Sequence, residues 1–183
     1  AIYSLALDDE DNIYVTGGTN SSNFPTTSFS FQPTYLDTSS ADAFVTLVAS
    51  DGSQIISSTY FGSNLYDQSY FVELGKDNNV YLFGQTKALG NTLVSNAPYF
   101  QPDAGQFISV LSKDLSNLVR STVVGTGKGT PDISPTAFLV DVCNKIYISG
   151  WGSNLSTGLS TLNLPTTSNA FQTNTDGNDF YLM

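Results

Sequence analysis

The hexapeptide NIYVTG at residues 12–17 decides the fold, because its pattern returns as NVYLFG at residues 79–84 and as KIYISG at residues 145–150. Each copy contains a β-branched residue, a tyrosine and an aliphatic residue, and each ends in glycine. Short runs of β-branched and aromatic residues between turn residues predict β-strands. The repeated tyrosines, which lie 67 and 66 residues apart, are Tyr14, Tyr81 and Tyr147. A regular spacing of this kind predicts that one structural unit is repeated along the chain.

Further strand-like segments follow each copy in the same order. AFVTLVA at residues 43–49 is matched by QFISVLS at residues 106–112, and SSTYFG at residues 57–62 is matched by RSTVVG at residues 120–125. A long segment rich in Ser, Thr and Asn separates the second strand of each unit from the third. None of these segments has the apolar spacing of a helix. The sequence therefore predicts an all-β chain in which each unit is an antiparallel meander of four strands.

Four-stranded antiparallel units in tandem are typical of β-propeller blades. We expect blade 1 at residues 1–66, blade 2 at residues 67–134 and a truncated blade 3 at residues 135–183, all in one propeller domain. This makes about two and three-quarter blades, whereas closure of a propeller takes about four to eight. We therefore expect an incomplete fragment whose partners are the remaining propeller blades of the same, longer polypeptide. An isolated chain of this kind is expected to aggregate or to stay partly unfolded.

The long segment between the second and third strands carries large apolar residues at recurring places. We expect these residues to pin the segment onto its blade, where it must satisfy its own backbone polar groups. In an alternative interpretation, some of them contact a ligand. The expected anchors are Phe24 and Phe31 in the first unit, Phe100 in the second, and Leu164 and Phe171 in the third.

The order of short motifs in the first unit resembles the bacterial β-propeller repeat called SBBP. These motifs are N-x-Y-V-T-G-x-T, F-P-T-T, F-Q, D-A-F-V, D-G-S and S-T-Y-F-G. The second unit is less similar, because KALGNTLVSNAPYFQPDAGQ at residues 87–106 replaces the F-P-T-T segment. The third unit is similar again, up to Met183.

The third unit also resembles large secreted surface proteins of gliding Bacteroidetes. Those proteins typically end in a gliding-motility-associated C-terminal sorting domain and leave the cell through the type nine secretion system. The resemblance therefore implies an extracellular or outer cell-surface location, a link to gliding motility, and secretion machinery as a partner.

Composition excludes several classes of function. The chain has 16 acidic and 6 basic residues, a net charge of −10, and no histidine. This charge repels phosphate backbones and anionic lipid, so we expect neither nucleic-acid nor membrane-surface binding. The sequence has no run of about 18 apolar residues, so we do not expect membrane insertion either. Without histidine, Ser-His-Asp and Cys-His arrangements and histidine-based zinc sites are excluded within this chain. Cys143, the single cysteine, is interpreted as a structural or incidental thiol, and no catalytic residue is expected.

Two places in the sequence are candidate binding sites. The acidic turn DDED at residues 8–11 is interpreted as a solvated turn, because its equivalents, KDN at residues 76–78 and VCN at residues 142–144, do not repeat the cluster. In an alternative interpretation of this turn, clustered oxygens of Asp9, Asp11 and Asn12 bind calcium. No other cofactor is expected. Trp151, the only tryptophan, stands where the polar segment of the third unit begins. It either packs on its blade or stacks on a sugar ring of a ligand.

These observations favour a non-catalytic, secreted scaffold or adhesion module. The first alternative is a carbohydrate-binding module that contacts surface glycans through Trp151 and the aromatic residues of the polar segments. The second alternative is a glycosidase or lyase that works with paired carboxylates, some of them on other blades.

Overall fold

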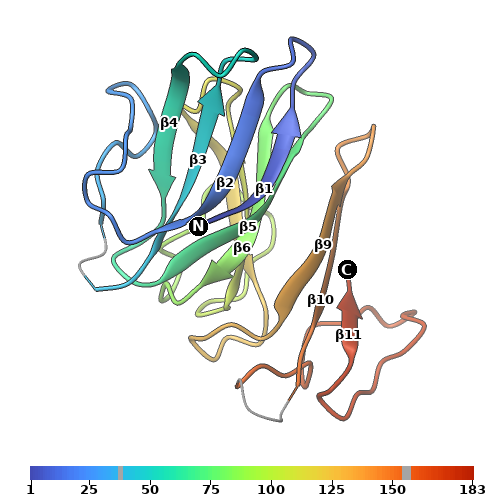
Figure 1. Cartoon of the computed structure of the whole chain (residues 1–183). Coiled ribbons are helices and arrows are strands. Elements are labelled where there is room, and N and C mark those ends of the chain that lie inside the picture. The colour runs from blue at the N-terminus through green and yellow to red at the C-terminus, as the bar shows by residue number, and fades with distance from the viewer. Residues whose placement is uncertain (37–38, 154–157) are drawn as a thin grey trace.

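The computed structural model of the chain describes residues 1–36, 39–153 and 158–183. Within these ranges all strands belong to three separate antiparallel sheets, and no helix is present (Figure 1). The described residues accordingly include no helix long and apolar enough to cross a membrane.

Each sheet is a meander in which the strands follow one another in chain order, and each is called a blade below. Blade 1 consists of β1 (Ile2–Leu7), β2 (Ile13–Thr19), β3 (Asp42–Val48) and β4 (Ile55–Phe61). Blade 2 consists of β5 (Asp67–Leu74), β6 (Val80–Thr86), β7 (Gln106–Leu111) and β8 (Leu118–Val124). Blade 3 consists of β9 (Ser134–Val140), β10 (Ile146–Trp151) and β11 (Phe180–Leu182). The expected all-β, incomplete propeller is confirmed, and the three tyrosine-bearing strands lie in different sheets.

The apolar core lies between the blades. Tyr14, Val45 and Phe61 of blade 1 form one cluster with apolar residues of blade 2, and the rings of Phe61 and Phe107 are 5.0 Å apart. A second cluster joins blade 2 to blade 3, where the rings of Phe83 and Phe138 are 5.6 Å apart. Because each cluster draws on two sheets, burial of a blade depends on its neighbour.

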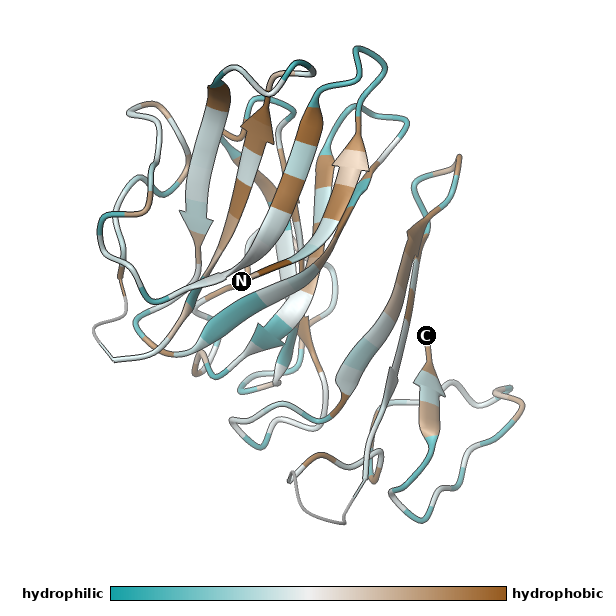
Figure 2. Ribbon diagram, in the orientation of Figure 1, coloured by the Kyte–Doolittle hydropathy of each residue, from teal (hydrophilic) through white to brown (hydrophobic). Residues whose placement is uncertain are grey.

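The two faces of blade 1 differ in what covers them. Alternation along paired strands places Tyr14 on the face toward blade 2 and Leu5, one position out of phase, on the opposite face. Part of that opposite face is apolar and open to solvent: Leu5 is 63% exposed, and Leu7 and Ile55 are also exposed. Toward β3 and β4 the same face is covered, because Phe44 and Tyr60 are buried. Figure 2 shows the alternation of apolar and polar residues along β1 and β2.

The long segment between the second and third strands covers the outer edge of its own blade. In blade 1, the backbone N–H of Thr27 donates to the Ser58 carbonyl at 2.9 Å, and the Tyr60 N–H donates to the Gln32 carbonyl at 3.0 Å. Both Ser58 and Tyr60 belong to β4, the outermost strand. In blade 2, an isolated antiparallel bridge joins the corresponding segment to β8. The length of this segment is therefore explained, because a bare strand edge would expose a row of unpaired backbone groups.

The predicted anchors of this segment have mixed outcomes. Phe24 packs on Phe44, with ring centroids 4.4 Å apart, and Phe31 stacks on Phe61 at 6.3 Å. Leu164 is buried, as expected. Phe100 is only partly covered.

The prediction for Phe171 is wrong, because its side chain is fully exposed. Its counterpart Phe31 stacks on Phe61 of the fourth strand, β4, whereas the described sheet of blade 3 has three strands. The described sheet of blade 3 therefore offers Phe171 no counterpart of Phe61.

We expect Leu82→Ala to lower the free energy of unfolding by about 2–5 kcal/mol, because Leu82 is fully buried between blades 1 and 2. Leu5→Ala, the matched control on the open face, should change it by less than about 0.5 kcal/mol. Urea denaturation followed by tryptophan fluorescence and circular dichroism measures both values. Equal losses in the two variants would contradict the assignment of the core to the blade interface.

Candidate functional site

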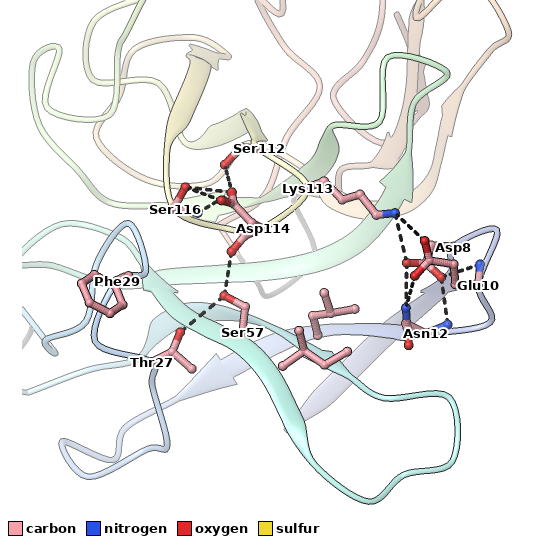
Figure 3. A pocket seen from close by; sticks show the side chains of 12 residues that line it. Asp8, Glu10, Asn12, Thr27, Phe29, Ser57, Ser112, Lys113, Asp114 and Ser116 are labelled. Carbon is pink, nitrogen blue, oxygen red and sulfur yellow. Dashed lines mark hydrogen bonds and ion pairs between the residues drawn. The ribbon is translucent and has the colours of Figure 1, made fainter.

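A groove of about 680 Å³ lies where the β1–β2 turn of blade 1 meets the β7–β8 turn of blade 2 (Figure 3). Five chain segments supply its walls: the two turns, the polar segment after β2, the end of β3 and the start of β4. The lining residues are Asp8, Glu10, Asn12, Thr27, Phe29, Leu47, Ile56, Ser57, Ser112, Lys113, Asp114 and Ser116. Residues far apart in the chain thus converge here, which makes the groove the candidate functional site.

The Asp8 carboxylate organises the β1–β2 turn. It accepts the backbone N–H groups of Glu10 and Asn12, both at 2.9 Å, and the Asn12 side-chain amide at 3.1 Å. Asp11 completes the turn in the left-handed backbone conformation, with a φ of 61°. This is the arrangement of a side-chain-stabilised turn, which Asp forms readily.

The same turn recurs in the other blades. Asp141 in blade 3 accepts the backbone N–H groups of Cys143 and Lys145 at 2.8 and 2.9 Å. In blade 2, Asp77 accepts the Asn79 N–H at 3.2 Å. The left-handed residues at the matching position are Asn78 and Asn144. The backbone turn therefore repeats, although the acidic side chain is two positions later in blade 2, where Gly75 matches Asp8. The acidic cluster of residues 8–11 itself does not repeat, and its interpretation as a solvated turn stays a prediction.

Ion pairs and hydrogen bonds fix the β7–β8 turn of blade 2 to blade 1. Lys113 forms ion pairs with Asp8 and Glu10, both with N–O distances of 3.7 Å. The Tyr14 hydroxyl donates to the Lys113 carbonyl at 2.8 Å, across the blade interface. The Ser57 hydroxyl donates to the Asp114 carbonyl at 2.7 Å. The repeated tyrosine thus acts here as a buried link between blades as well as a core residue.

Hydrogen bonding keeps the groove anionic. Hydrogen bonds from the side chains of Ser112 and Ser116 hold the pKa of Asp114 below its ordinary value. Desolvation acts to raise the pKa of Asp8, but hydrogen bonds from Asn12 and Glu10 and the charge of Lys113 lower it overall. Burial, with the nearby Asp8 and Asp114 charges, raises the pKa of Tyr14 to about 12, so this hydroxyl remains a donor.

The opposite side of the groove is apolar and accessible. Phe29 is 90% exposed, and Ile56, another lining residue, is also exposed. The hydroxyl groups of Thr27 and Ser57 also line the groove (Figure 3). An exposed ring near hydroxyl and carboxylate oxygens suits a polar ligand with an apolar side, such as a sugar.

The residues predicted as sites from the sequence lie elsewhere or at the edge of this groove. Asp9 and Asp11 are exposed, and within residues 1–36, 39–153 and 158–183 no group of three or more His, Cys, Asp or Glu residues is placed to hold a metal ion. The calcium site therefore stays a prediction. Trp151 ends β10 in blade 3, where it pairs with Phe180 of β11 and is 37% exposed. Cys143 is exposed in the β9–β10 turn.

Sequence reasoning did not identify Phe29, Lys113 and Asp114. Lys113 occupies the position of Ser50 in the blade 1 turn, so the repeat gives no signal for it. Phe29 gives a weak signal, as an aromatic residue two positions before the repeated Phe31.

Comparison with known proteins supports the repeat. The family model described as the beta-propeller repeat, SBBP, matches residues 2–25, which contain β1, β2 and the start of the polar segment. No curated protein matches the chain.

We expect Asp8→Asn to lower the free energy of unfolding at pH 7 by about 1 kcal/mol, through loss of hydrogen-bond strength and of the Lys113 ion pair. Because the pKa of Asp8 is lowered on folding, its contribution is present above the unfolded-state pKa of about 3.9 and disappears as the pH falls through the folded-state pKa. Urea melts at pH 7 and pH 3 measure this difference. Asp9→Asn, the control at an exposed neighbour, should have little effect at pH 7, and a deficit of Asp8→Asn that persists unchanged at pH 3 would contradict the electrostatic role.

Proposed function

We propose that this chain is part of a non-catalytic β-propeller that serves as a scaffold or adhesion module on the outside of the cell. The observation that carries the proposal is the equivalence between the open face of blade 1 and the buried face of blade 2. A module whose free face is built like an interior face is suited to stack on further blades of the same polypeptide.

The equivalence holds residue by residue across the strands. On blade 2, the paired row that faces blade 1 is Val72, Leu82, Ser109 and Ser121. On blade 1, the corresponding row on the opposite face is Leu5, Val15, Thr46 and Ser58, of which Leu5 is exposed whereas Thr46 and Ser58 are buried. In both rows the last two hydroxyls lie 2.7 Å apart. The open face thus has the chemistry of a face that a neighbouring blade covers.

The location is proposed from family resemblance and composition. The SBBP match over residues 2–25 supports the propeller repeat. The proposal of secretion through the type nine system and of a link to gliding motility rests on the resemblance of the third unit to surface proteins of gliding Bacteroidetes. In this proposal the secretion machinery is a transient partner. A low content of charged residues, 12%, with many neutral hydroxyl and amide groups, suits an extracellular β protein.

A carbohydrate-binding module is the second candidate. The groove favours it, because Phe29 presents an open aromatic face beside hydroxyl and carboxylate oxygens. A glycosidase is a weaker alternative at this place, since such an enzyme needs a carboxylic acid with a raised pKa. Asp8 and Asp114 in the groove both have lowered pKa values.

Stacking predicts that the isolated chain self-associates through the open face of blade 1. We expect Leu5→Glu to reduce both concentration-dependent association in sedimentation velocity and the fluorescence of bound ANS, because it places a charge on that face. Ser53→Glu, at an exposed turn position, is the matched charge control and should change neither. If Leu5→Glu associates and binds ANS like the unmodified chain, the stacking proposal fails.

A glycan-binding measurement distinguishes a scaffold or adhesion module from a carbohydrate-binding module. A scaffold should give no saturable signal on a glycan array, whereas a carbohydrate-binding module should give one that Phe29→Ala or Trp151→Ala abolishes. Leu89→Ala, which removes an exposed apolar side chain outside the groove, is the control. A saturable signal lost only in the aromatic variants would replace the scaffold proposal by the carbohydrate-binding one.

A further inference from the structure

A second cavity adjoins the groove at the junction of blades 1 and 2. It has a volume of about 260 Å³ and lies where the β1–β2 turn of blade 1 meets the β5–β6 turn of blade 2. Asp8 and Lys113 line both this cavity and the groove, so the two spaces share a wall. Other residues that line the second cavity include Asp9, Leu74, Lys76 and Asn78.

The shared wall contains ion pairs. The Lys113 ammonium lies 3.7 Å from a carboxylate oxygen of Asp8 and 3.7 Å from one of Glu10. Figure 3 shows these ion pairs at the end of the groove opposite Phe29. The Lys113 side chain is 45% exposed. Because ion pairs of exposed side chains are weak, a ligand displaces this side chain at little cost.

The groove and the second cavity together cross the end of blade 1. Phe29 lies in the polar segment beyond β4, and Lys76 lies in the β5–β6 turn, beyond β1. The sheet order places β4 and β1 three strand spacings apart, which is about 14 Å. A ligand that contacts both residues is therefore longer than a single sugar ring.

Both spaces combine an apolar side with polar groups. In the groove, the exposed ring of Phe29 accompanies several hydroxyl groups. In the second cavity, Leu74 accompanies three polar side chains, those of Asp9, Lys76 and Asn78. These three side chains form no hydrogen bond or ion pair with residues 1–36, 39–153 or 158–183, so they are available to a ligand. A sugar ring has the matching character, with an apolar face and hydroxyl groups at its edge.

The charges of the two spaces favour a neutral ligand. Acidic residues outnumber lysines there, which disfavours an anionic polymer. The carboxylates of Asp8 and Asp114 already accept hydrogen bonds within their own turns, so they do not require a cation from the ligand. The charged residues that line the two spaces are Asp8, Asp9, Glu10, Asp114, Lys76 and Lys113.

We propose that the groove and the second cavity are two parts of one cleft, which holds an extended segment of a neutral, linear polysaccharide. Phe29 stacks on one sugar ring, and Lys76 and Asn78 bond to the hydroxyl groups of a ring further along the chain. The inference rests on the carbohydrate-binding candidate of the proposed function. It adds the length and charge of the ligand and the residues of a second subsite.

The test is isothermal titration calorimetry of the whole chain with neutral glucan, mannan and xylan oligosaccharides of two and of six units. We expect the hexasaccharide of the recognised series to bind about tenfold more tightly than its disaccharide, because only the longer chain reaches the second cavity. Uronic-acid hexasaccharides should bind more weakly than the neutral one. Equal affinities for the two lengths, or tighter binding of the acidic chains, overturns the inference.

Matched protein variants locate the second subsite. Lys76→Ala should weaken the hexasaccharide by about tenfold and leave the disaccharide unchanged, because it removes a charged hydrogen-bond donor that only the longer chain reaches. Phe29→Ala should weaken both lengths. Lys145→Ala, at an exposed lysine of the β9–β10 turn outside the cleft, is the control and should change neither.

The outcomes separate this inference from the function on which it rests. If Phe29→Ala weakens binding whereas Lys76→Ala leaves the hexasaccharide unaffected, the cleft is wrong and the carbohydrate-binding candidate stands. If no neutral oligosaccharide binds at either length, both fail.

Discussion

A four-stranded sheet with apolar side chains on both faces is unable to bury either face alone, and this constraint organises the whole molecule. Both apolar clusters lie between sheets, and ring contacts such as Phe61 with Phe107 cross from one blade to the next. The stability of each blade is consequently coupled to that of its neighbours, as in other repeat architectures. The ion pairs of Lys113 and the hydrogen bond of Tyr14 reinforce the coupling at the groove.

A second constraint comes from the sheet edges. An outermost strand leaves its backbone groups unpaired, and this protein covers them with a long segment of the same blade. The Ser, Thr and Asn content of that segment suits the task, because these side chains bond readily to nearby backbone. The Thr27 hydroxyl, for example, accepts the Ser58 N–H at 3.1 Å. The groove uses the same segment, which places Phe29 and Thr27 on its wall.

The repeat made the fold predictable from sequence, because three tyrosine-bearing strands at a regular spacing specify three similar sheets. Anchors within one blade, such as Phe24, were also predictable. The exposure of Phe171 was not, because the sequence repeat alone implied the same packing as Phe31, whereas the described sheet of blade 3 has three strands. Lys113 and Asp8, 105 residues apart, meet only because two blades pack together, and the position of Lys113 carries no periodic signal. Single-sequence patterns therefore revealed the scaffold better than the groove.

The inequality of the two blade faces has a geometric consequence. The side chains of Tyr14 and Leu47 in blade 1 face blade 2, and those of Val72 and Leu82 in blade 2 face blade 1. Because these two faces differ, the junction joins unlike surfaces. Such head-to-tail joints give an array a direction and admit no twofold arrangement at the junction. When the same rotation relates each blade to the next, the blades form either a closed ring or an open helical array. The small turn between successive sheets, rather than any single side chain, fixes which of these forms the complete polypeptide takes.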